Sequence, residues 1–175
     1  MSLILLAGGI ASGKSSLASA LAERLGAEVV SVRRALIDIV GSPTDRVSLQ
    51  REGAALDART NGEWLADYLE TRCTSGTHLI VDSVRTLKQT LPILTRFDSA
   101  VLIYLDASES TRFERFESAK SKDPLKRTVS LEDAMLHPTE VGVRALRPFA
   151  ALVLATDDRD VESVAADVIA TLQSE

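Results

Sequence analysis

The sequence contains few of the residues that build disulfides, soft-metal sites or membrane spans. Of its 175 residues, one is cysteine and two are histidine. The single Cys73 excludes an internal disulfide, and so few histidines argue against a zinc-type site. The longest apolar run is about a strand in length, far short of the roughly 20 residues that cross a membrane. The first residues also lack the basic region of a signal peptide. We therefore expect a cytoplasmic protein without membrane contacts.

Positive charge is outnumbered by negative charge, and much of it falls in two stretches. There are 20 Lys and Arg residues against 25 Asp and Glu, a net charge of -5, which argues against a nucleic-acid partner. Such stretches are usually solvated surfaces, but in a phosphate-handling protein they would form basic arms of the site. The two sets are Arg33, Arg34, Arg46, Arg51 and Arg59, then Arg112, Arg115, Lys120, Lys122, Lys126 and Arg127.

Apolar runs of strand length alternate with helical patterns along the chain. The runs are residues 3–7, 27–31, 78–82, 100–105 and 151–155. Helical patterns cover 15–25, 33–72 with breaks near 41–43 and 61–62, 108–120 and 160–172. Residues 121–130 hold few apolar anchors and are expected to form a mobile loop. The alternation predicts an α/β fold with three layers, a doubly wound, five-stranded parallel sheet that binds ligands at the carboxyl ends of its strands.

The first apolar run leads into a glycine-rich loop of defined spacing. Residues 8–15 match the phosphate-binding pattern G-x-x-x-x-G-K-[ST], the P-loop, between a strand and a helix. Backbone N–H groups of such a loop surround phosphate oxygens, and the following helix N-terminus adds positive potential. Lys14 is predicted to contact the β- and γ-phosphates of ATP, and Ser15 to hold Mg²⁺. The predicted ATP-binding residues here are Gly8, Gly9, Ile10, Ala11, Ser12, Gly13, Lys14, Ser15 and Ser16.

The third apolar run ends in Asp82, and Arg85 follows three residues later. An acid at the end of a strand beside a P-loop suits a role in holding Mg²⁺, directly or through water. The alternative is an aspartate that only caps the next turn. Arg85 is predicted to bridge donor and acceptor phosphates, because a guanidinium pairs with phosphate oxygens in a bidentate manner. The alternative for Arg85 is an ordinary surface arginine.

Several short motifs, in order along the chain, resemble those of nucleoside monophosphate kinases. Asp82-Ser83-Val84-Arg85-Thr86 resembles the Asp-Gly-Phe-Pro-Arg-Thr segment of adenylate kinases and, more closely, the Ser-Asp-Val-Arg segment of phage-type deoxynucleoside monophosphate kinases. The stretch 45–64 is similar to the Arg-x-x-Leu-Gln-x-x-Gly motif and following Trp of the second group, and 137–140 to their His-x-Ser-Glu. The resemblance implies a P-loop NTPase fold of the nucleoside monophosphate kinase type, formed by residues 1–175 as a single domain.

The resemblance also implies two mobile parts around the P-loop. A helical arm at about 33–74 would bind the acceptor through Arg34, Arg46 and Gln50, with Arg85 beside them; Arg46 and Gln50 also fit a solvated helix face. Trp64 fits a core or hinge position better than a base-stacking one. A lid at about 115–140 would bring Arg115 and Lys120 to the transferring phosphoryl group as catalytic cations with Lys14 and Arg85.

The lid departs from the adenylate kinase pattern, because lysine supplies much of its charge. Lysine neutralises phosphate as a point charge and lacks the fork of arginine. Lys122, Lys126 and Arg127 are further lid cations on this view. Arg115 and Thr156 would lie at the donor nucleotide. Glu140 fits either a residue that orients the acceptor or lid, or an ordinary glutamate at the start of a helix.

Together these features predict phosphoryl transfer from ATP with Mg²⁺ to a small phosphorylated acceptor, with a nucleoside or deoxynucleoside monophosphate preferred. Dephospho-CoA kinase or another small-molecule P-loop kinase is an alternative, because Gly-Gly-Ile-x-Ser-Gly-Lys-Ser also resembles the opening of the former. A nucleotide switch or ATPase without an acceptor is a second alternative. The acceptor base, the choice of ATP or GTP and the state as monomer or homodimer stay open.

Overall fold

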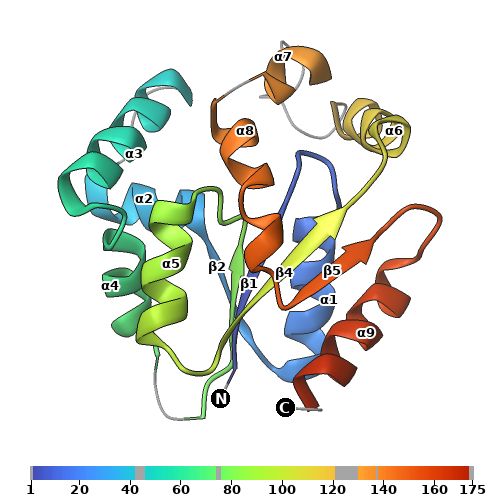
Figure 1. Ribbon diagram of the computed structural model, residues 1–175, viewed down its shortest axis with the longest axis horizontal. Helices are drawn as coiled ribbons and strands as arrows, with labels where there is room; N and C mark the ends of the chain where they lie inside the picture. Colours follow the sequence, from blue (N-terminus) through green and yellow to red (C-terminus); the bar gives the residue numbers. More distant parts are fainter. Residues whose placement is uncertain (1, 42–45, 74–75, 121–129, 137, 174–175) are drawn as a thin grey trace.

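Five parallel strands form one sheet in the order β2-β3-β1-β4-β5 (Figure 1). They are β1 (Leu3–Gly8), β2 (Glu28–Ser31), β3 (Leu79–Asp82), β4 (Ala100–Asp106) and β5 (Leu152–Ala155). The computed structural model describes residues 2–41, 46–73, 76–120, 130–136 and 138–173. All six residues of β1 are buried, because this strand lies between two neighbours and is covered on both faces.

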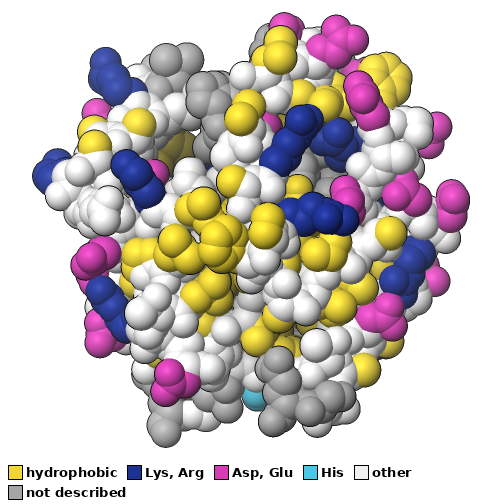
Figure 2. All heavy atoms as spheres, viewed as in Figure 1, with side chains coloured by type: hydrophobic (Ala, Val, Ile, Leu, Met, Phe, Trp, Pro, Cys, Tyr) yellow, Lys and Arg dark blue, Asp and Glu magenta, His cyan; other side chains and the backbone are white. Residues whose placement is uncertain are grey.

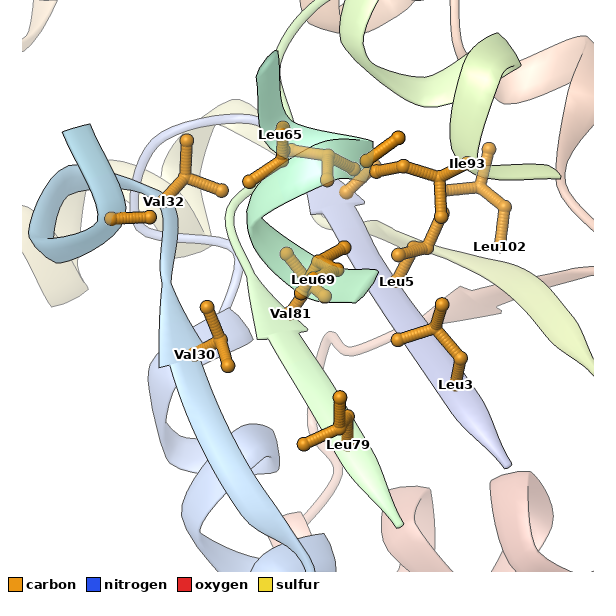
Figure 3. Close-up of a cluster of buried hydrophobic side chains, with 14 of the residues drawn as sticks. Leu3, Leu5, Val30, Val32, Leu65, Leu69, Leu79, Val81, Ile93 and Leu102 are labelled. Atoms are coloured by element: carbon orange, nitrogen blue, oxygen red, sulfur yellow. The ribbon is translucent and has the colours of Figure 1, made fainter. Parts of the chain in front are cut away.

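Helices cover both faces of the sheet. Helices α1 (Lys14–Leu25) and α9 (Val161–Gln173) pack on one face, where Leu17, Leu21 and Val168 meet Ile4 and Leu6 of β1. The other face is covered by α2 (Val32–Val40), α4 (Trp64–Glu70), α5 (Leu87–Arg96) and α8 (Pro138–Arg144). Figure 3 shows Leu3 and Leu5 of β1 in this second cluster. Alternate residues of β1 therefore serve two cores, which makes the three layers of the predicted fold.

All five predicted strands are present, within one residue or so at each end. The predicted helical stretch 33–72 contains α2, α3 (Arg46–Thr60) and α4, and its breaks lie at glycines with positive φ. Gly62 has φ 82°, and a Cβ there would lie 2.2 Å from the Lys88 carbonyl oxygen, so no other residue fits this turn. Residues 121–129, most of the predicted mobile loop, lie outside the described residues.

The sequence pattern predicts no residue ranges for four elements of the described part of the chain: α5, α7 (Leu131–Met135), α8 and the 3-10 helix η2 (Arg147–Phe149). Helix α5 contains Pro92, which obscures its pattern. Its start is nevertheless well capped, because the Thr86 side chain accepts a hydrogen bond from the Gln89 N–H at 3.3 Å. Among the described residues, no helix combines the length and apolar character needed to cross a membrane.

Candidate active site

The P-loop connects β1 to α1 at the carboxyl end of the sheet (Figure 1). Gly13 is the N-cap of α1 with φ 96°, and Gly8 has φ 143°. A Cβ on Gly8 would lie 2.4 Å from the Leu105 carbonyl oxygen on β4, so the loop needs glycine there for both space and backbone angle. The Gly13 cap has no side-chain hydrogen bond, so the first N–H groups of α1 are available to an anion.

Lys14, the first residue of α1, folds back into the loop. Its Nζ donates to the carbonyl oxygens of Gly8 at 2.8 Å and Gly9 at 2.7 Å. Burial of the ammonium lowers the pKa of Lys14 to about 8; the nearby Glu140 carboxylate acts in the opposite direction, and the cation of Arg85 adds to the decrease. An anion bound in the loop would favour the charged form of this lysine.

Ser15 and Asp82, the two predicted metal ligands, lie together. The Ser15 hydroxyl donates to Asp82 Oδ2 at 2.9 Å, and the Ser83 hydroxyl to Asp82 Oδ1 at 2.8 Å. Register places Asp82 here, since it pairs with Leu6 two residues before the loop begins. A hydroxyl and a carboxylate are hard oxygen donors of the kind that Mg²⁺ takes, with water and phosphate filling its other positions. The described residues contain no cluster of three or more His, Cys, Asp or Glu side chains that could hold a metal alone.

Arg115 and Thr156 meet beside the P-loop. Arg115 is on α6 (Glu109–Lys120), and its two terminal nitrogens donate to the Thr156 hydroxyl at 3.0 Å and carbonyl at 2.7 Å. The Thr156 hydroxyl in turn donates to the Ser12 carbonyl at 3.1 Å. The structure thus brings these two predicted donor-site residues together and ties both to the loop.

Asp157 fixes the start of α6 next to this contact. Its carboxylate accepts hydrogen bonds from the Thr111 hydroxyl at 2.6 Å and the Ser108 N–H at 2.9 Å. These bonds stabilise the charged form and lower the pKa of Asp157 to about 2. The base of α6, and with it Arg115, is therefore held to the segment that follows β5.

Arg85 and Glu140 form a second link to the loop. Arg85 Nη1 lies 3.5 Å from Glu140 Oε1, and Glu140 Oε2 accepts the Ile10 N–H at 2.8 Å. Glu140 lies in the first turn of α8, and only 9% of its surface is exposed. Since Ile10 is in the P-loop and Arg85 follows β3, one carboxylate joins the ends of two neighbouring strands.

A cavity of about 320 Å³ adjoins the P-loop and is lined by arginines. It shares Gly9 and Glu140 with the loop region, and its cations are Arg112, Arg144 and Arg147. Arg112 packs against Gly9, because a Cβ there would lie 2.7 Å from Arg112 Nη1. Figure 2 shows Lys and Arg side chains gathered on this face, over the region between α8 and the end of β4. Asp106 also lines the cavity and pairs with Arg147 at 3.5 Å.

A protein-family model described as "AAA domain" matches residues 4–135. The chain belongs to this family. The match covers the P-loop, Asp82 and Arg85, and extends through α7. A search of curated proteins gave no match.

Solved structures with the same fold include several kinases of small molecules. A shikimate kinase from Bacteroides thetaiotaomicron superposes with a TM-score of 0.67 at 17% identity over 98% of both chains. An APS kinase from Mycobacterium tuberculosis, in complex with AMPPNP and APS, gives 0.63 at 18% identity over 98% of this chain and 97% of its own. A gluconokinase from Sinorhizobium meliloti gives 0.57 at 22% identity over 99% and 92%. The fold of this AAA-domain chain is therefore that of the P-loop kinases, as the sequence predicted.

Two predicted acceptor-arm residues have described side chains, Arg34 and Gln50, and neither lines the cavity beside the P-loop. Arg34 pairs with Asp38 at 3.0 Å in a separate pocket of about 270 Å³, whose lining residues include Tyr68 and Arg72 but no P-loop residue. Gln50 is half-buried on α3. The side chains of Arg46 and Lys120 are outside the described part of the chain, as are Lys122, Lys126 and Arg127 entirely. The acceptor roles of Arg34, Arg46 and Gln50 and the lid role of Lys120 stay predictions.

Trp64 lies in the core, the position that the sequence favoured. It is 4% exposed, and its indole N–H donates to Asp57 at 2.6 Å. Asp57 also accepts two hydrogen bonds from the Gln89 amide at 3.0 Å. This network joins α3 and α4, both within the predicted acceptor arm, to α5.

The sequence did not single out the cations of the arginine-lined cavity. In the sequence, only a basic stretch marks Arg112, and no motif marks Arg144 or Arg147. Arg144 does have a local signal, since it follows Glu140 by four residues and so lies near it along α8. Arg147 lies beyond α8 in η2, where no periodic pattern marks it.

Proposed function

We propose that this chain is a kinase that transfers the γ-phosphoryl group of ATP to a small phosphorylated acceptor, with a nucleoside or deoxynucleoside monophosphate preferred. One observation carries the proposal: the P-loop, with Lys14, Ser15 and Asp82, adjoins a cavity of about 320 Å³ that is lined by three arginines. A nucleotide switch needs a phosphate site alone. A cationic cavity beside the P-loop supports the binding of a second anion, and hence transfer of a phosphoryl group between two substrates.

On the donor side, different residues would contact different parts of the bound ATP. P-loop N–H groups and Lys14 would hold the β- and γ-phosphates, and Arg115 with Thr156 would lie at the donor nucleotide. Ser15 and Asp82 would hold Mg²⁺, which neutralises charge on the phosphate oxygens when bound. Catalysis would then consist of positioning and charge stabilisation by this chain's cations, without a covalent intermediate on a side chain.

On the acceptor side, the arginines favour an anionic group. A guanidinium binds phosphate oxygens through two parallel N–H bonds. Within the described part of the chain, neither Arg112 nor Arg144 forms an ion pair, whereas Arg147 is paired with Asp106. The Arg112 Nε is buried without a hydrogen-bond partner among the described residues. The motifs of residues 45–64 support a nucleotide as the molecule that carries the anion.

A second candidate is transfer to a hydroxyl group of a small acid. The solved structures that share this fold include a shikimate kinase and a gluconokinase, and their names support this reading. Glu140, a buried carboxylate next to Arg85, would be one nearby group able to accept a hydroxyl proton.

A coupled assay of ADP formation across an acceptor panel tests the proposal. The panel holds the common ribo- and deoxyribonucleoside monophosphates, dephospho-CoA, shikimate and gluconate, each with ATP or GTP as donor. We expect acceptor-dependent turnover with at least one monophosphate. Turnover only with an acid that carries a hydroxyl group would favour the second candidate. Hydrolysis of ATP that no acceptor accelerates would contradict both and favour a nucleotide switch or ATPase.

A further inference from the structure

Glu140 is a carboxylate buried in a site that is otherwise rich in cations. It is 9% exposed and lines the same cavity as Arg112 and Arg144. A negative charge beside a phosphate site repels the phosphate, and its burial costs hydration energy. Such a residue needs a compensating role, and its contacts indicate one.

The two oxygens of Glu140 have different partners. Oε2 accepts the Ile10 N–H of the P-loop at 2.8 Å, and Oε1 lies 3.5 Å from Arg85 Nη1. Hydrogen bonds to a charged acceptor are stronger and more directional than neutral ones. One side chain thus connects the donor loop with the arginine that we place between donor and acceptor.

The helix that carries Glu140 is itself held firmly. Val143 of α8 and Leu146 just after it are 1% and 0% exposed and belong to the core on this face of the sheet. The α8 backbone also approaches Arg85 closely, because a Cβ on Gly142 would lie 3.2 Å from the Arg85 carbonyl oxygen. Arg85, by contrast, has a long side chain that is 42% exposed, in a loop where Ser83 has φ 75°. Its guanidinium needs an external anchor to keep one position.

We propose that Glu140 is a positioning residue that fixes Arg85 and the tip of the P-loop in one relative arrangement for phosphoryl transfer; the inference rests on the proposed function. Arg85 is then oriented toward the γ-phosphate before the acceptor arrives, and α8 carries the restraint. The carboxylate also offsets the mutual repulsion of the cations around it, which include Lys14, Arg85 and Arg112.

Two substitutions of Glu140 separate its contact with the Ile10 N–H from its contact with Arg85. Glu140→Ala removes both contacts, and we expect kcat to fall about 10²-fold, the loss that a misplacement of about 1 Å produces. ATP affinity, measured by calorimetry, should fall by less than about threefold, because Glu140 does not hold the triphosphate and its charge repels phosphate. Glu140→Gln keeps a carbonyl oxygen for the Ile10 N–H but loses the charge that orients Arg85, so its kcat should lie between those of wild type and Glu140→Ala.

A matched control is Glu162→Gln. Glu162 also lies in the first turn of a helix and pairs with an arginine, Arg24, at 3.0 Å, but it is exposed on α9. This variant should keep the wild-type kcat. The Ile10 amide gives a readout that does not depend on turnover: its proton resonance in ¹⁵N-isoleucine-labelled protein should move upfield in Glu140→Ala and stay near its wild-type position in Glu162→Gln.

Coupling to Arg85 decides between a positioning and a general structural role. If Glu140 acts through Arg85, the double variant Glu140→Ala with Arg85→Ala should be no slower than Arg85→Ala alone. Independent, multiplying losses, or a wild-type kcat in Glu140→Ala, would overturn the inference while leaving the proposed function in place. If wild-type protein serves no acceptor, the proposed function fails instead. The same comparison is then made on its hydrolysis of ATP, where equal rates for wild type and Glu140→Ala overturn the inference.

Discussion

At the P-loop site, the pKa of a single side chain depends on the balance between its burial and the charges around it. Lys14 illustrates it: the loop that must bind a polyanion also removes the lysine ammonium from water, and its pKa falls to about 8. Glu140 and Asp82 limit that fall, whereas Arg85 and Arg112 deepen it. The charge needed for phosphate binding therefore titrates near pH 8, well below the pKa of an exposed lysine.

ATP binding should consequently depend on pH just above neutrality. Below pH 8 Lys14 is charged, so its contribution to ATP affinity is constant. As the pH rises through 8 the free protein loses this charge, and affinity should fall by up to about tenfold per pH unit because binding then requires proton uptake. Calorimetry at pH 8.5 in two buffers of different ionisation enthalpy measures that uptake.

Rising pH affects folding stability through Lys14 in the opposite direction: it weakens ATP binding but stabilises the fold. Its pKa is lower in the folded state than the ordinary 10.5, so the charged form destabilises the fold below pH 8, and this penalty disappears between about pH 8 and 10.5.

Lys14→Met, which cannot titrate, is the control for the measurement of proton uptake on ATP binding. Equal proton uptake by Lys14→Met and wild type on ATP binding would contradict the assignment to Lys14.

Arg85 should act mainly on the rate of transfer. Its guanidinium lies 3.5 Å from Glu140 and is 42% exposed, so it is free to meet phosphate oxygens but is not part of the P-loop that holds ATP. We expect Arg85→Ala to lower kcat by about 10²-fold or more, with a much smaller change in the dissociation constant of ATP. Arg85→Lys should recover only part of the rate, because lysine lacks the fork. An unchanged kcat in Arg85→Ala would remove Arg85 from the site.

At the scale of elements, the P-loop requires glycine at two positions, Gly8 and Gly9, for different reasons. At Gly8, φ is 143° and a Cβ would meet the backbone of β4 at 2.4 Å, which cannot move without disturbing the sheet. At Gly9 the obstacle is the far end of a flexible side chain, Arg112, at 2.7 Å. One glycine is thus required by the fold, and the other by the arginine that lies against it.

Alanine at each position should therefore have separable effects. Gly8→Ala should lower the free energy of unfolding by more than about 2 kcal/mol, through strain and a backbone clash. Gly9→Ala should cost less than about 1 kcal/mol, because Arg112 can rotate away. Turnover in Gly9→Ala should nevertheless fall, since the guanidinium leaves its place beside the loop. Urea unfolding and steady-state kinetics check the two together, and a Gly9→Ala protein less stable than Gly8→Ala would refute the distinction.

At the scale of the whole molecule, the sequence predicted those parts that depend on short-range spacing. The five apolar runs predict the strands, and the three central ones, β1, β3 and β4, are mostly buried between the layers of helices. The P-loop and Asp82 lie where strands end. Contacts across long sequence distances were not predictable. Ile10 and Glu140 are 130 residues apart, and their bond depends on how α8 packs on β1. Arg34 has its Asp38 partner on its own helix, but the sequence could not show that this ion pair lies in a separate pocket.

The two cores on opposite faces of the sheet share β1, and this makes a prediction about cooperativity. Leu21 of α1 is 0% exposed in one core, whereas Trp64, the single tryptophan of the chain, is in the other. Leu21→Ala should cost about 2–5 kcal/mol through the cavity that it leaves. If the chain unfolds as one unit, the transition seen by Trp64 fluorescence should shift as far as the one seen by far-ultraviolet circular dichroism. An exposed substitution on the same helix, Glu23→Ala, should shift neither. A Leu21→Ala protein whose fluorescence transition stays in place would show that the two faces unfold separately.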